Sequence, residues 1–181
     1  MGTPRQQLLS LLADHTLFTT DTVPPFVSDT PKATDGWSRL LDEMETIAST
    51  IEEEGWETLT VPAGDAAAVT AAGGYTDRHG FTYVIPGDAA ETFRDWFEPE
   101  RFGRTEVYRA TGGSHLFVLT VLRDQESERA VLIAGVIDRT ELEAVERAAR
   151  ETDVMYSHLF GVDATHLGTI QHDDPAPFFA E

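Results

Sequence analysis

Three consecutive segments, residues 105–111, 114–122 and 130–137, carry the strongest hydrophobic pattern of the chain. They are rich in β-branched and aromatic residues, which is typical of strands. The second and third segments are apolar at consecutive positions, so both faces of these strands must be covered. The pattern predicts the core of a sheet at residues 104–137, covered on both sides by helices or by a second subunit.

A glycine pair, Gly112-Gly113, separates the first two of these strands. Two glycines between β-rich segments predict a tight hairpin in which both turn residues have positive φ. A two-residue loop at this place would set Ala110 opposite His115 and Tyr108 opposite Phe117.

In the rest of the chain, segments with a strand pattern alternate with segments whose apolar residues recur at helical spacing. Further strands are expected at 56–61, 80–85, 154–160 and 165–172, and further helices at 66–72, after Asp88 and after Asp138. An apolar stripe at helical spacing predicts the most clearly marked helix of the chain, which ends at Gly55. This stripe consists of Trp37, Leu40, Leu41, Met44, Ile47, Ala48 and Ile51.

These elements predict an α+β fold, with a single mixed, mainly antiparallel sheet of about six or seven strands packed with three or four helices. The order strand–strand–helix–strand occurs over 56–110 and again over 115–160, which indicates either a loose ββαβ duplication or a coincidence, since strand-to-helix junctions commonly use the same cap residues. Residues 1–35 are expected to form a short helix and an extended arm, and residues 36–179 a single domain.

The charge of the chain is strongly one-sided. Its 32 Asp and Glu residues outweigh 13 Lys and Arg residues, which leaves a formal net charge of −19, and Lys32 is the only lysine. Such a surface is suited to molar salt, where the screening length falls to about 3 Å and self-repulsion weakens. The composition therefore favours a halophilic protein.

The same composition excludes several classes of function. A protein that binds nucleic acid or an anionic membrane needs clustered Lys and Arg, and the sequence has no basic run. The absence of cysteine excludes disulfides and thiolate chemistry. No apolar run reaches the ~18 residues of a membrane span, and we expect a cytoplasmic protein.

The histidines are the remaining candidates for chemistry, because no phosphate-binding loop, dinucleotide fingerprint or hydrolase motif is present. A Gly161-Val162-Asp163 loop in the last hairpin would place His158 opposite His166, with His172 on the same face. Two of these imidazoles with His115 or Asp173 could hold a divalent metal. The alternative is that each histidine makes a structural hydrogen bond, and a one-residue change of the loop would break the pairing.

Several short motifs resemble a family of small halophilic archaeal proteins whose function is unknown. They are Gly55-Trp56-Glu57, the strand Glu106–Ala110, the two apolar strands after it, and the closing segment His172–Phe179. The resemblance covers residues 37–179 and implies a halophilic origin, but it implies no catalytic residue.

The function expected from the sequence is that of a non-catalytic binding or protein-interaction module without a cofactor. Such a module would form a homodimer or bind a protein partner through the N-terminal arm or the sheet. The alternative is a metal-dependent, hydrolase-like enzyme that uses His158, His166 and His172.

The charge pattern generates a prediction on salt. Because screening weakens repulsion among the carboxylates, we expect the melting temperature to rise by about 10 °C or more between dilute buffer and ~2 M KCl. Thermal unfolding followed by circular dichroism measures this shift, and a melting temperature that does not change with KCl would contradict the halophilic interpretation.

Overall fold

The computed structural model describes residues 29–70, 78–98, 101–102 and 104–179. A long helix opens this part of the chain and eight strands follow, with further helices between and after them. The elements are α2 (Asp29–Glu53), β1 (Glu57–Pro62), β2 (Asp65–Val69), β3 (Gly80–Ile85), α3 (Gly87–Trp96), β4 (Arg104–Gly112), β5 (His115–Asp124), β6 (Arg129–Asp138), η2 (Arg139–Glu141), α4 (Leu142–Thr152), β7 (Met155–Gly161), β8 (His166–His172) and α5 (Ala176–Phe179).

The strands form two four-stranded mixed sheets. Sheet A has the order β1-β6-β5-β4 and sheet B the order β2-β3-β7-β8. Each sheet contains one parallel pair, β1 with β6 and β3 with β7, and its other pairs are antiparallel. The α+β class is confirmed, but the prediction of a single sheet of six or seven strands is wrong.

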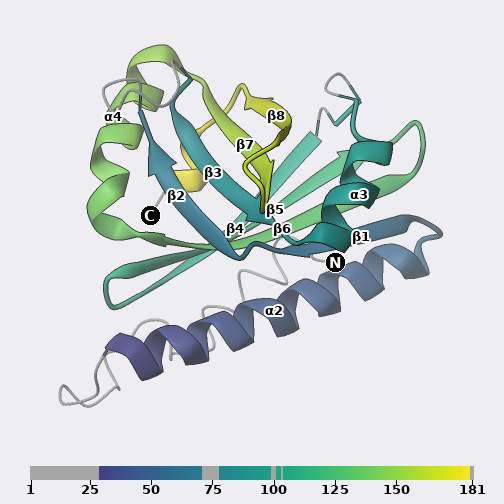
Figure 1. Cartoon of the computed structure of the whole chain (residues 1–181), viewed down its shortest axis with the longest axis horizontal. Helices are drawn as coiled ribbons and strands as arrows, with labels where there is room; N and C mark the ends of the chain where they lie inside the picture. The colour runs from purple at the N-terminus through teal and green to yellow at the C-terminus, as the bar shows by residue number, and fades with distance from the viewer. Residues whose placement is uncertain (1–28, 71–77, 99–100, 103, 180–181) are drawn as a thin grey trace, which may run out of the picture.

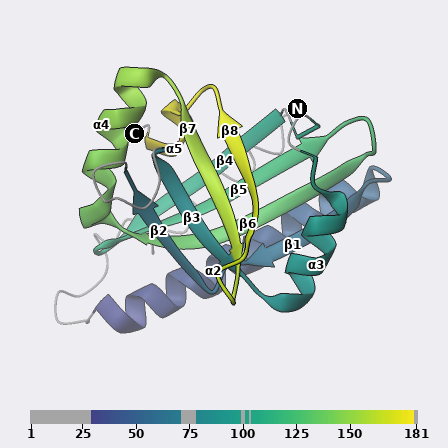
Figure 2. The same cartoon turned by 45° about the horizontal axis from the view of Figure 1, so that its top comes forward.

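The chain passes from one sheet to the other at a corner between β1 and β2. At this corner the amide of Ala63 donates to Ala134 of β6, in sheet A, and the amide of Gly64 donates to Val84 of β3, in sheet B. Such bends allow one strand to serve two packed sheets. The result is three layers, with α2 on the outside of sheet A and sheet B across its inner side (Figures 1 and 2).

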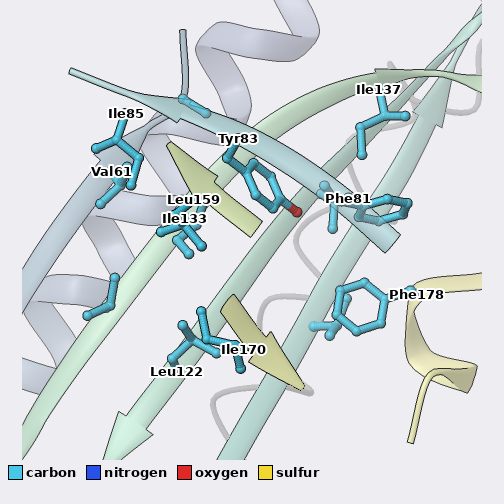
Figure 3. Close-up of a cluster of buried hydrophobic side chains, with 14 of the residues drawn as sticks. Val61, Phe81, Tyr83, Ile85, Leu122, Ile133, Ile137, Leu159, Ile170 and Phe178 are labelled. Atoms are coloured by element: carbon cyan, nitrogen blue, oxygen red, sulfur yellow. The ribbon is translucent and has the colours of Figure 1, made fainter. Parts of the chain in front are cut away.

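The main core fills the space between the two sheets (Figure 3). Alternate residues of β5 and β6, among them Leu122 and Ile133, point into it from sheet A, and Phe81 and Leu159 meet them from sheet B. The other face of β5 and β6 packs against Leu40, Met44 and further apolar residues of α2. Both faces of these strands are therefore covered, as their pattern predicts, but a sheet covers one of them in place of the expected helices.

Two shorter helices lie at opposite ends of the sheet pair (Figure 1). Helix α3 contacts β1 and β8, while α4 contacts β2 and β7. Asp138 caps the short helix η2 that leads into α4, because its carboxylate accepts from the amide of Thr140, as its place after an apolar strand predicts.

The hairpin between β4 and β5 differs from its predicted register. Gly112 pairs with His115 and Ala110 with Phe117, so the turn residues are Gly113 and Ser114. Only the first of them has a positive φ, which is what a type II′ turn requires. The predicted pairs of Ala110 with His115 and of Tyr108 with Phe117 are therefore wrong, although a shift of two residues leaves every side chain on its predicted face.

The alanine-rich segment after Asp65, predicted as a helix, forms β2 instead. Its small residues allow the two sheets to approach closely, since a Cβ placed on Gly135 of β6 would lie 3.2 Å from the Cβ of Ala66. Pairing with β3 outweighs the helical propensity of a segment this short.

The suggested duplication is not supported by the sheet topology. In the first unit β1 and β3 belong to different sheets, whereas in the second unit β5 and β6 are paired neighbours. The shared order of elements therefore does not correspond to a repeated structural unit.

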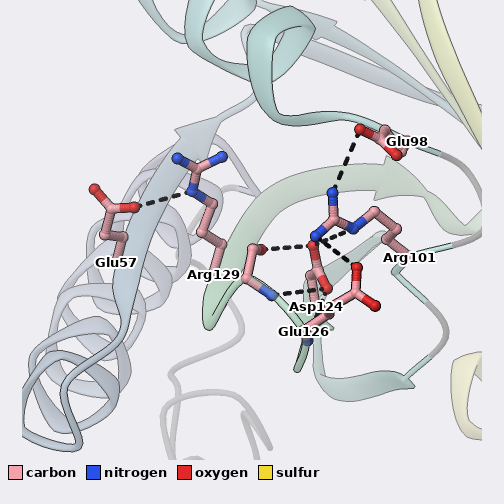
Figure 4. A network of polar contacts seen from close by, with 7 residues as sticks. Glu57, Glu98, Arg101, Asp124, Glu126 and Arg129 are labelled. Atoms are coloured by element: carbon pink, nitrogen blue, oxygen red, sulfur yellow. Dashed lines mark hydrogen bonds and ion pairs between the residues drawn. The ribbon is translucent and has the colours of Figure 1, made fainter.

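Two charged residues at the end of β5, Arg123 and Asp124, are buried, and hydrogen bonds and ion pairs offset the cost of burying their charges. Asp124 accepts from the amides of Glu126 and Ser127 and from the Ser127 hydroxyl, and the Arg101 guanidinium lies 3.3 Å away (Figure 4). Burial raises the pKa of Asp124, but these contacts outweigh burial and hold the pKa below its ordinary value.

The neighbouring Arg123 faces the α2 side of sheet A. Its guanidinium approaches the carboxylate of Glu106, with 3.5 Å between Nε and Oε2, and it lies over the Trp56 ring at 5.5 Å. The hydroxyl of Tyr108 donates to the same carboxylate at 3.2 Å. These contacts compensate a charge that would otherwise be costly to bury.

The expected N-terminal helix and most of the arm lie outside the described residues. Residues 29–35, which the sequence assigns to the arm, already belong to α2.

The packing of α2 generates a prediction at Gly36. In a helix interior Gly→Ala normally stabilises by about 1 kcal/mol, but a Cβ at Gly36 would overlap the ring of Phe117. We therefore expect Gly36→Ala to lower the free energy of unfolding by about 1–2 kcal/mol.

Denaturant unfolding measures this change, and Ser49→Ala on the exposed side of the same helix is the matched control. The control should be neutral or slightly stabilising. A Gly36→Ala protein as stable as the control would show that the helix does not pack on Phe117 in this way.

Candidate functional site

The last hairpin places the predicted histidines differently from the sequence-based expectation. His158 pairs with Thr169, and a register shift between Leu159 and Phe160 then sets Phe160 opposite His166. The predicted pairing of His158 with His166 is therefore wrong. Both side chains nevertheless lie on the outer face of sheet B, which is the face directed away from sheet A.

A chain of hydrogen bonds connects the two histidines through one hydroxyl. His158 Nε2–H donates to the carbonyl of Arg78 at 2.9 Å. Because a carbonyl can only accept, Nδ1 of neutral His158 is an acceptor, and the Thr169 hydroxyl donates to it at 3.0 Å. The Thr169 oxygen in turn accepts from His166 Nε2–H at 2.7 Å.

Aromatic side chains extend this group along β7. Tyr156, His158 and Phe160 alternate on the outer face because successive side chains of a strand point to opposite faces. The rings of Tyr156 and His158 are nearly parallel, and their centroids are 6.1 Å apart. The centroids of the Phe160 and His166 rings are 5.3 Å apart. We call Tyr156, His158, Phe160, His166 and Thr169 the outer strip of sheet B.

The outer strip ranges from buried to exposed. His158 is buried, Tyr156 and Phe160 are half-buried, and His166 is exposed. Burial lowers the pKa of His158, the bond to the Arg78 carbonyl raises it, and the nearby His166 and Arg78 lower it further. The net shift is downward and favours neutral His158 at neutral pH.

His172 lies on the opposite, inner face and does not join the other two. Its Nε2 is 2.8 Å from the Ser157 hydroxyl, and its Nδ1 is 3.4 Å from the Thr105 hydroxyl. A Ser–His contact of this length is suited to nucleophilic catalysis, but Ser157 is fully buried and His172 is 3% exposed. Both hydrogen-bond partners of His172 are hydroxyls, so this pair supports the core.

Further hydroxyls lie near this pair between the sheets. The Tyr83 side chain points into the core (Figure 3), and its hydroxyl approaches those of Thr120 and Ser157 without completing a hydrogen bond among the described residues. Burial raises the pKa of Tyr83. The core therefore contains a small polar group contributed by both sheets.

The other two predicted ligands lie apart from the outer strip. His115 lies at the β4–β5 turn beside Ser114, and Asp173 follows β8 and accepts from Gln171 at 2.7 Å. In the part of the chain that the structure describes, no group of three or more His, Asp or Glu side chains could hold a metal ion. The predicted set of His158, His166, His172, His115 and Asp173 is thus not assembled at one place.

The sequence did not point to two contributors to this site, Thr169 and Arg78. Thr169 lies three residues after His166, but only the shifted register of β8 brings its hydroxyl to His158. Arg78 contributes a backbone carbonyl, which any residue type would supply, and its guanidinium lies 5.5 Å from the centre of the Tyr156 ring.

The comparison with known proteins gives one match. Residues 26–180 match the model of DUF7529, described as a family of unknown function. The chain belongs to this family. No curated protein and no solved structure matches the chain. Among its described helices, none is both long and apolar enough to cross a membrane.

The buried position of His172 generates a prediction on pH. Burial lowers its pKa to about 4, against 6.5 for the free side chain, with a small opposing effect of Asp173. Between these values the unfolded chain binds a proton that the folded chain does not. His172 should therefore destabilise the fold as pH falls from 6.5 to 4, by about 3 kcal/mol in total.

Urea unfolding at several pH values measures this effect. We expect His172→Gln to lose stability less steeply than the wild type over this range, whatever its stability at pH 7. His115→Gln, at the β4–β5 turn, should keep the wild-type slope. Equal slopes in the two variants would contradict the role assigned to His172.

Proposed function

We propose that this protein is a non-catalytic binding module that associates with a second copy of itself through the outer face of sheet B. The outer strip is the observation that carries the proposal. Its members are aromatic rings, imidazoles and a hydroxyl, so it combines apolar surface with hydrogen-bonding groups. Interfaces are enriched in such aromatic residues. In Figure 2 no described helix lies across this face.

Charge favours the outer strip over the outer side of α2 for self-association. A chain of net charge −19 repels its own copy. The outer side of α2 exposes Asp42, Glu45, Glu52 and Glu53, whereas the outer strip contains no carboxylate. A twofold dimer brings the same patch of both copies together, so the outer strip is less repulsive than the outer side of α2.

The size of the face suggests a weak dimer. Four strands spaced about 4.8 Å apart, each about 20 Å long, present roughly 400 Å² in projection. A stable interface of ordinary size buries about 800 Å² for each partner. The proposed dimer therefore belongs to the weak, transient class.

The placement of the three histidines supports binding over the metal-dependent hydrolase alternative, because His172 lies on the opposite face of sheet B from His158 and His166. His158 and His172 each contact partners through both ring nitrogens. A general base needs a free nitrogen within reach of substrate. These contacts instead hold neighbouring elements together.

A halophilic setting fits this proposal. High salt screens the repulsion between two acidic copies and strengthens the burial of apolar surface. We propose that self-association, like folding, is favoured in concentrated salt, as it would be in a halophilic cytoplasm.

The proposal is tested by sedimentation in ~2 M KCl over protein concentrations from about 1 to 200 µM, a range chosen for a weak dimer. We expect a monomer–dimer equilibrium in the wild type. The double variant Tyr156→Thr/Phe160→Thr should weaken it by about tenfold or more, because aromatic residues contribute most where an interface is best packed.

The matched control is Val162→Thr in the β7–β8 turn. Val162 is 75% exposed but does not belong to the outer strip. It should leave the equilibrium unchanged. A chain that stays monomeric over the whole range, or a dimer that the strip variant does not weaken, would refute the proposal.

A further inference from the structure

We infer that His158 and His166 form a two-imidazole site for a divalent transition-metal ion such as Zn²⁺, centred near the Thr169 hydroxyl. Nδ1 of His158 and Nε2 of His166 approach this hydroxyl from two neighbouring strands, at 3.0 and 2.7 Å. Imidazole is a preferred ligand of Zn²⁺, Cu²⁺ and Ni²⁺. The inference concerns one chain and does not depend on self-association.

The partner of the other His158 nitrogen supports this assignment. A metal-ligating histidine usually donates its second N–H to a carbonyl or carboxylate, which fixes the tautomer and the ring orientation. His158 already has this arrangement, since Nε2–H donates to the Arg78 carbonyl at 2.9 Å. Because this bond places the proton on Nε2, the Nδ1 lone pair of neutral His158 is directed toward the Thr169 hydroxyl and His166.

The distances require only small movements. Zn–N bonds are about 2.0–2.1 Å long, so an ion at the position of the Thr169 oxygen would need each nitrogen to move by about 1 Å or less. His166 is exposed and has room to move. The Thr169 hydroxyl must rotate away, and the proton on His166 Nε2 moves to Nδ1, so that both imidazoles stay neutral and no proton is released.

Two features limit the affinity. The described residues provide two protein ligands, and water would complete a tetrahedral shell. The positive charge of Arg78 acts on His158 and therefore repels a metal ion bound there. The site should therefore bind less tightly than a closed structural zinc site.

Calorimetric titration of the full chain with Zn²⁺ tests the inference, in concentrated KCl so that the acidic surface is screened. We expect one zinc-specific site, with Mg²⁺ titrated in parallel to reveal binding to carboxylates alone, because Mg²⁺ prefers oxygen ligands. His166→Ala should weaken zinc binding by about tenfold or more, given that losing even an outer-shell partner costs this much. His115→Ala, at the β4–β5 turn, should bind zinc as the wild type does.

Nitrogen NMR of the imidazoles identifies the ligands. Zinc should shift Nδ1 of His158 and Nε2 of His166 and leave the nitrogens of buried His172 in place. Three results would each overturn the inference: zinc heats no larger than those of Mg²⁺, unchanged zinc affinity in His166→Ala, or zinc shifts confined to other histidines.

Discussion

The double cover of β5 and β6 is the constraint on which the rest of the structure depends. These strands are apolar on both faces, so neither face can be left to water without a large loss of hydrophobic stabilisation. Helix α2 covers one face and sheet B covers the other. This arrangement requires a chain that crosses between the sheets, and the bend between β1 and β2 provides the crossing while small residues at Ala66 and Gly135 let the sheets approach.

The same layering separates two kinds of polar group. On the inner face of sheet B, His172 and Ser157 lie in the core, bonded to each other, and His172 also contacts the Thr105 hydroxyl of sheet A. On its outer face, buried His158 is connected through the Thr169 hydroxyl to exposed His166, beside the rings of Tyr156 and Phe160. Because successive side chains of a strand point to opposite faces, Ser157 of β7 lies in the core while the next residue, His158, belongs to the outer strip.

The candidate site illustrates what a sequence pattern can and cannot locate. The chain order and the residue types single out the last hairpin and its histidines, and two of them do share a partner. The register does not follow from the pattern, because the shift between Leu159 and Phe160 adds one residue to β8. Since strand periodicity is two, one extra residue moves later side chains to the other face, and His172 is therefore inside while His166 is outside.

The α+β class, the amphipathic helix α2, most strand positions and the need to cover both faces of β5 and β6 can all be predicted from the amino-acid pattern. These follow from local periodicity and from the cost of exposing apolar residues. Three features follow only from the folded structure: a second sheet covers one face of β5 and β6, the alanine-rich segment after Asp65 is a strand, and Gly113 and Ser114 form the turn. The first two depend on contacts with other segments of the chain, which outweigh local propensity when a short segment can adopt either structure. The turn depends on the register in which β4 and β5 pair, which two adjacent glycines leave open.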